Sequence, residues 1–64
     1  MNAATVSRLL NSKLPSLKNE YQVSTKNGEI LVTVTDFQVQ LVLENAINNF
    51  GAMCVQTKDG FVVA

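Results

Sequence analysis

The sequence predicts a small α+β protein, built as a two-layer α/β sandwich in the order αββαββ, with a four-stranded, mainly antiparallel sheet and two helices on one face. The tetrapeptide Thr-Lys-Asn-Gly at 25–28 recurs as Thr-Lys-Asp-Gly at 57–60, and each copy separates two short runs of β-type residues. Each pair of runs follows a segment whose apolar residues have helical spacing. The 64 residues are therefore expected to form one domain of two αββ halves, 1–35 and 36–64.

The first helix is predicted from apolar residues spaced three and four positions apart, with Asn2 as its N-cap. Pro15 lacks an N–H and disfavours helical geometry at the residue before it, so the helix is expected to end near Ser12 or Lys13. The apolar positions of this helix and its exit are Ala3, Val6, Leu9, Leu10, Leu14 and Leu17.

The first hairpin joins residues 20–25 and 29–35 through Asn27-Gly28, the preferred pair for a two-residue type I′ turn. This turn sets a register in which Lys26 faces Glu29 and Val23 faces Val32. The apolar partners then share one face of the sheet, so turn chemistry and hydrophobic pattern agree.

The second helix is expected to begin after Asp36 as N-cap and to end at Gly51, because an apolar stripe from Val39 to Phe50 has helical spacing. A competing interpretation exists for residues 37–43, whose apolar residues also alternate as in a strand. The run 44–49 lacks strand character and favours the helix.

The last hairpin is predicted from residues 52–56 and 61–64, with Asp59-Gly60 in the turn. The register of the first hairpin, applied here, places Thr57 opposite Val62 and Val55 opposite Ala64. An ungapped alignment of the two halves matches only five positions, three of them hairpin residues, so the repeat is topological and does not show duplication.

Composition excludes several classes of site. One Cys cannot form an internal disulfide, and the absence of His removes the common zinc spacings. Five cations balance five anions along the chain, which argues against nucleic acid as the main partner. No stretch is long and apolar enough for a membrane span, so we expect a cytoplasmic protein without cofactor, metal or small-molecule substrate.

Catalytic chemistry is not expected. Cys54 falls in a predicted strand with no His to activate it, which favours a structural role. Asp36 is expected to cap a helix, Asp59 to form a turn and Glu29 to pair with Lys26, so no pair of carboxylates defines an acid and base. The protein is therefore not expected to be an enzyme.

Residues 4–11 (Ala-Thr-Val-Ser-Arg-Leu-Leu-Asn) resemble the recognition helix of lactose-repressor-type helix-turn-helix domains. The resemblance implies that Thr5, Ser7 and Arg8 approach the major groove and phosphates of DNA. It covers eight of 64 residues, and a hairpin is predicted where that family has further helices.

A surface for another protein is predicted from apolar residues left outside the core. If the helices cover the sheet face with Tyr21, Val23, Ile30, Val32, Val34, Met53 and Val55, the opposite face carries Leu31, Cys54, Phe61 and Val63. The predicted contact residues are Leu31, Phe61 and Val63, then Phe37 and Leu41 of the second helix. The alternative is that the register or the helix assignment differs and these residues belong to the core.

The expected function is a non-catalytic protein-protein interaction module. It would act as a homodimer or as an adaptor or inhibitor on a partner protein, by its open sheet face or by a free edge at the C-terminal strand that ends at Ala64. A viral or mobile-element origin is compatible with such a short chain. The alternative is a small nucleic-acid-binding accessory protein that uses the scattered basic residues Arg8, Lys13, Lys18, Lys26 and Lys58.

Overall fold

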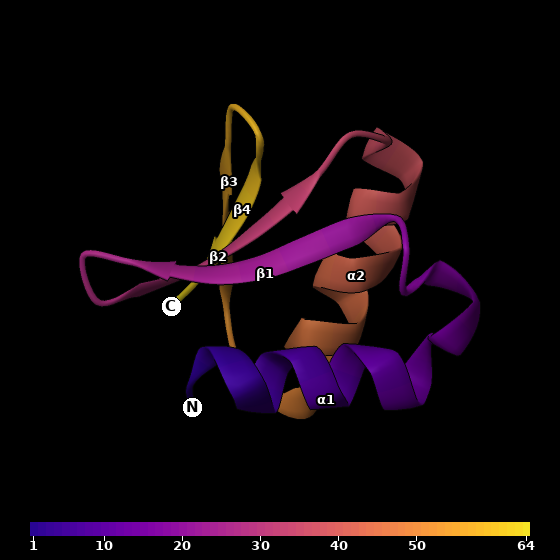
Figure 1. Cartoon of the computed structure of the whole chain (residues 1–64), viewed down its shortest axis with the longest axis horizontal. Coiled ribbons are helices and arrows are strands. Elements are labelled where there is room, and N and C mark those ends of the chain that lie inside the picture. The colour runs from indigo at the N-terminus through magenta and orange to yellow at the C-terminus, as the bar shows by residue number, and fades with distance from the viewer.

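Two helices and a four-stranded antiparallel sheet make up the computed structural model, which describes every residue from Met1 to Ala64 (Figure 1). The elements are α1 (Ala3–Lys13), the 3-10 turn η1 (Pro15–Leu17), β1 (Tyr21–Lys26), β2 (Glu29–Val34), α2 (Phe37–Phe50), β3 (Cys54–Thr57) and β4 (Gly60–Val63). The α+β class is confirmed, and η1 is an element that the predicted order did not contain.

Both helices begin and end through the residues expected from the sequence. The Asn2 side chain accepts a hydrogen bond from the Thr5 amide at 2.9 Å, and Asp36 accepts bonds from the first amides of α2. Gly51 ends α2 in the left-handed conformation, with φ of 106°. Residues 37–43 lie within α2, so the strand interpretation of this segment is wrong.

The first hairpin has the predicted register, with Lys26 opposite Glu29 and Val23 opposite Val32. Asn27 and Gly28 both have positive φ, 54° and 79°, as a type I′ turn requires. A local sequence signal therefore determines this half of the sheet.

The strand order is β1-β2-β4-β3, so the two hairpins meet through β2 and β4, and β1 and β3 form the edges. The expectation of a free edge at the C-terminal strand is wrong, because β4 pairs with β2 on one side and β3 on the other. In the central ladder, Leu31 pairs with Val62, while Ile30 pairs with Val63 and Val32 with Phe61. This pairing has an approximate two-fold symmetry about the Leu31–Val62 pair. The hairpins are equivalent at an offset of 31 residues, since the innermost pair Lys26–Glu29 corresponds to Thr57–Gly60.

The second hairpin differs from its prediction by two positions. Its turn is Lys58-Asp59, Gly60 begins β4, and Val55 pairs with Val62 instead of Ala64. Gly60 lies close to β2, where a Cβ on this residue would be 2.0 Å from the carbonyl oxygen of Val32. Gly60 also has a φ of 156°, which residues with a side chain rarely adopt, so both the close approach and the backbone conformation require glycine here.

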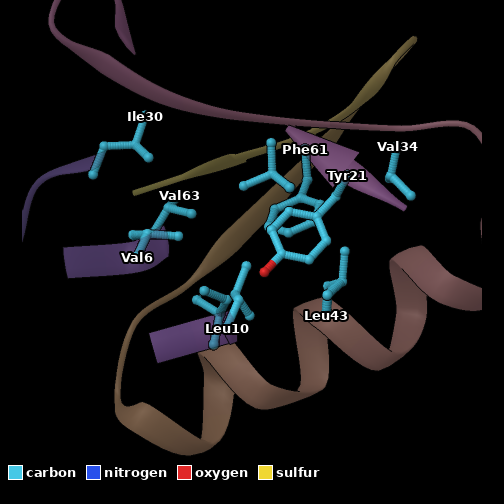
Figure 2. Packing of buried hydrophobic residues seen from close by; sticks show 10 residues of the cluster. Val6, Leu10, Tyr21, Ile30, Val34, Leu43, Phe61 and Val63 are labelled. Carbon is cyan, nitrogen blue, oxygen red and sulfur yellow. The ribbon is translucent and has the colours of Figure 1, made fainter. Parts of the chain in front are cut away.

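The core lies between the helices and one face of the sheet, as Figure 2 shows for its buried side chains. Phe61 is fully buried, in one cluster with Tyr21, Leu10 of α1 and Leu43 of α2 (Figure 2). The core consists of Val6, Leu10, Tyr21, Ile30, Val32, Val34, Leu43, Ile47, Phe61 and Val63. Tyr21 also donates a hydrogen bond from its hydroxyl to Asn11 of α1 at 2.6 Å, which ties the first edge strand to the helix before it.

Candidate interaction site

Two of the predicted contact residues are not on the surface. Phe61 is 0% exposed and Val63 is 6% exposed, so the expectation that they form an open-face contact is wrong. Their pairing with Val32 and Ile30 in the central ladder turns both side chains toward the helices. Cys54, opposite Val63, faces the same way and packs partly against the core.

The assignment of Met53 and Val55 to the core face is wrong for the same reason. The last hairpin keeps the predicted grouping of its side chains, but its two faces are reversed relative to the helices. Met53 is 71% exposed and Val55 is 56% exposed. The alternation in residues 61–63 (Phe-Val-Val) is too apolar to show which face is buried, so only the contact with β2 decides it.

The other three predicted contact residues remain accessible. Leu31 is half-buried on the open face of β2, while Phe37 and Leu41 are exposed on α2, one turn apart. Their role in binding stays a prediction. Met53 and Val55 were expected in the core, but they are more exposed than Leu31.

One row of side chains crosses the open face of all four strands. The pairings place Ser24, Leu31, Val62 and Val55 side by side, from the β1 edge to the β3 edge. The row is polar at β1 and apolar over the other three strands. Apolar surface on this face therefore increases toward β3.

The free edge of β3 presents backbone groups that no other strand pairs. Ala64 donates its amide to the Met53 carbonyl at 2.8 Å, so Met53, Val55 and Thr57 direct their backbone groups toward β4. The alternation of an antiparallel ladder then points the N–H and C=O groups of Cys54 and Gln56 outward. Charged side chains are one of the usual protections of an edge strand. Residues 51–57 contain none.

A polar network joins this edge to α2. The buried Gln40 amide donates to the Glu44 carboxylate at 2.8 Å and to the Gly60 carbonyl at 3.0 Å. The Gln56 amide of β3 donates to the same Glu44 oxygen at 3.3 Å. These contacts fix the side of α2 that faces β4 and β3.

The network also locates the exposed apolar residues of α2. Phe37 precedes Gln40 by three positions and Leu41 precedes Glu44 by three, so each lies beside a residue that contacts β4 or β3. Both lie on the outer flank of α2, beyond Gln40 and Glu44 as seen from the core. We call Phe37, Leu41, Met53, Val55 and the free backbone groups of Cys54 and Gln56 the β3 edge site.

Cys54 has no activating partner at this site. Burial, and secondarily the negative charge of Glu44, raises the pKa of the thiol to about 11. The thiol is therefore protonated at neutral pH, which opposes nucleophilic or redox chemistry. No group of three or more His, Cys, Asp or Glu side chains lies close enough to hold a metal ion.

The basic residues of the alternative function are spread over separate parts of the surface. Lys26 and Lys58 line one open-face hollow of about 430 Å³, together with the acidic Glu29 and Asp59. Lys13 instead lines a hollow between the two helices. Arg8 of α1 and Lys18 after η1 are exposed.

The segment that resembles a repressor recognition helix forms α1. Val6 and Leu10 of this helix are buried in the core, and Arg8 is exposed. The next elements along the chain are η1 and the β1–β2 hairpin. Arg8 does not line the open-face hollow that contains Lys26 and Lys58.

No protein-family model, curated protein or solved structure matches this chain in the three comparisons. Neither helix is long and apolar enough to cross a membrane.

Proposed function

We propose that the protein is a non-catalytic protein-binding module whose contact surface is the β3 edge site. The observation that supports this proposal is the coincidence of a free edge strand, which has no charged side chain of its own, with four large apolar side chains that are about half exposed or more. Edge strands bind other chains through their free backbone groups, and neighbouring side chains supply specificity. The proposed partner is a protein with an extended segment or an edge strand of its own.

The proposed layering explains why this edge is available. In a two-layer sandwich with α1 and α2 on one face, the helices use the core side of the sheet and leave its other face open. The helices contact β1, β2, β3 and β4 from the core side, where Val32 and Phe61 are buried. Val55 is exposed on the open face next to the β3 edge, and Met53 is exposed two positions before it.

The energetic scale is sufficient for specific recognition. Complete burial of a Val, Leu, Phe or Met side chain contributes about 1.5–3 kcal/mol, and these side chains begin about half exposed or more. A backbone hydrogen bond adds about 1 kcal/mol net. Part of this gain is lost to the entropy of association, so such a site suits binding in the micromolar range or tighter.

The test is capture of partners from a cell lysate by the immobilised protein, with a matched pair of variants. Val55→Glu places a charge at the β3 end of the open-face row, and Ser24→Glu places the same charge at the β1 end. We expect proteins captured by the wild type and by Ser24→Glu to be lost with Val55→Glu. Capture that Val55→Glu leaves intact would contradict the proposal, provided that circular dichroism shows all three proteins folded.

Nuclease treatment and salt separate the nucleic-acid alternative from this proposal. Binding through phosphate contacts falls steeply between low and moderate salt, because counterions are released. Apolar docking at the β3 edge site does not weaken in this way. Enrichment that nuclease abolishes would instead assign function to basic residues such as Lys26 and Lys58.

A further inference from the structure

We infer that the partner at the β3 edge site is a second copy of this chain, joined by antiparallel pairing of β3 with β3 about a two-fold axis through Val55. The result is one continuous eight-stranded sheet, with the helices of both copies on the same side. This inference rests on the proposed function and identifies the partner of the same surface. Three features of the edge support it.

The first feature is the position of the free backbone groups. Cys54 and Gln56 point their backbone N–H and C=O groups outward, whereas the backbone groups of Val55 between them point toward β4. A two-fold axis at Val55 places Cys54 opposite Gln56 of the second copy, and Gln56 opposite Cys54 of the second copy. Both are hydrogen-bonded pairs, so all four free groups of each copy find a partner.

The second feature is the side-chain match in this register. Val55 faces Val55 of the second copy in a non-hydrogen-bonded pair, where side chains approach most closely. Met53 lies opposite Thr57 on the same face. Lys58 lies opposite Ala52, so the register brings no like charges into direct opposition.

The third feature is that the apolar surface reaches beyond the strand. A stable interface buries about 800 Å² of each partner, roughly a fifth of the 4246 Å² that this chain exposes. A strand of four residues cannot supply that area alone, so the helix layer must contribute. Phe37 and Leu41, on the flank of α2 beside this edge, give each copy a second apolar contact region.

The opposite edge of the sheet does not share these features. The open-face residues of β1 are Gln22, Ser24 and Lys26, all of them exposed and polar. Lys26 adds a charge of the kind that protects edge strands from pairing. The inferred contact is therefore expected at β3 and not at β1, and β1 provides a control within the same molecule.

The first test compares proline variants at the two edges by sedimentation equilibrium. Gln56→Pro removes an outward N–H from β3 and leaves the ladder to β4 intact, whereas Thr25→Pro removes the equivalent outward N–H from β1. We expect a wild-type dimer, a dissociation constant raised about 30-fold or more by Gln56→Pro, and little change with Thr25→Pro. Gln56→Ala, which loses the side-chain bond to Glu44 but keeps the N–H, controls for the side chain.

The second test measures the register and does not depend on the folding of a proline variant. Both proteins carry Cys54→Ser, and one carries Val55→Cys while the other carries Thr57→Cys. Cβ atoms of a non-hydrogen-bonded pair are about 4.5–5.5 Å apart, close enough for a disulfide after a small shift, so Val55→Cys is expected to cross-link rapidly on oxidation. The two Thr57 positions are about 13 Å apart in this register and are expected to cross-link slowly.

A wild-type chain that remains monomeric up to about 1 mM would overturn the homodimer. Faster cross-linking at Thr57→Cys than at Val55→Cys would also overturn it. If lysate capture remained sensitive to Val55→Glu in a monomeric protein, only the inferred second copy would fall and the protein-binding function would stand. If the wild type dimerised but Gln56→Pro had no more effect than Thr25→Pro, the β3 contact would be rejected.

Discussion

The two halves of this protein place equivalent hairpins in one sheet but give their edge strands opposite surface chemistry. In the first half, β1 carries Gln22, Ser24 and Lys26 on the open face, and the Tyr21 hydroxyl bonds to Asn11. In the second half, the corresponding edge carries Met53 and Val55 and no charge within β3. The approximate symmetry of the strand order therefore does not determine which edge is protected from pairing. The side chains on each edge strand determine this.

The turns of the two hairpins differ in a similar way. Gly28 follows Asn27 in a turn that needs positive φ at both positions. Gly60, which the repeated tetrapeptide aligns with Gly28, instead lies against the Val32 carbonyl in the central ladder. Gly60 also has a positive φ, 156°, so glycine has a local role in both hairpins and an additional tertiary role in the second.

The largest expected effect contrasts the buried and open faces of the central strands. Phe61→Ala removes a fully buried ring and is expected to cost about 3–5 kcal/mol in the free energy of unfolding. Leu31→Ala, on the open face of β2, is expected to cost about 1 kcal/mol or less. Urea unfolding measures both, and Phe61→Leu keeps a measurable transition if the alanine variant does not fold. Equal losses at Phe61 and Leu31 would contradict the observed orientation of β4.

The next largest effect is the loss of stability when Gly60 or Gly28 is replaced by Ala. Gly60→Ala forces a Cβ into the Val32 carbonyl and strains a backbone whose φ is 156°, so the strands must separate, at an expected cost of about 1–3 kcal/mol. Gly28→Ala meets no neighbouring atom and pays only for its left-handed backbone, about 1 kcal/mol. Urea unfolding of the two variants tests the order. A larger loss for Gly28→Ala would show that the central ladder can adjust at Gly60.

The smallest effect concerns the pH dependence of the second half. Burial, followed by Glu44, raises the pKa of the Cys54 thiol from 9.0 in the unfolded chain to about 11 in the folded protein. The folded state therefore holds more protons between these values, so the contribution of Cys54 to stability is complete below pH 9 and is lost as pH rises toward 11. Cys54→Ala is expected to show a shallower loss of stability over this range than the wild type.

Comparison of the wild type with Cys54→Ala controls for the other titrating groups. Tyr21 also has a pKa raised by burial, with the same sign, but it is present in both proteins. Unfolding midpoints in urea, measured at intervals from pH 8 to 11, isolate the part due to Cys54. Parallel pH profiles would mean that the thiol titrates alike in the folded and unfolded states.

Short-range signals in the sequence determined most of the local structure. Asn2 and Asp36 cap the helices as expected, Gly51 ends α2, and Asn27-Gly28 sets the register of the first hairpin. Each of these signals acts within a few residues of the chain, through a hydrogen bond or a restricted backbone angle. Such interactions are present in the sequence itself and need no knowledge of distant partners.

Only the tertiary structure decided the orientation of the second hairpin and, with it, the candidate site. Residues 61–63 are apolar on both faces, so their pattern does not distinguish core from surface. The pairing of Val32 with Phe61, and the close approach at Gly60, place the Phe61 side chain in the core and the Val55 side chain on the open face. That choice depends on packing between strands nearly 30 residues apart, which no local propensity encodes. The β3 edge site exists because this long-range contact exposes Met53 and Val55 instead of Phe61 and Val63.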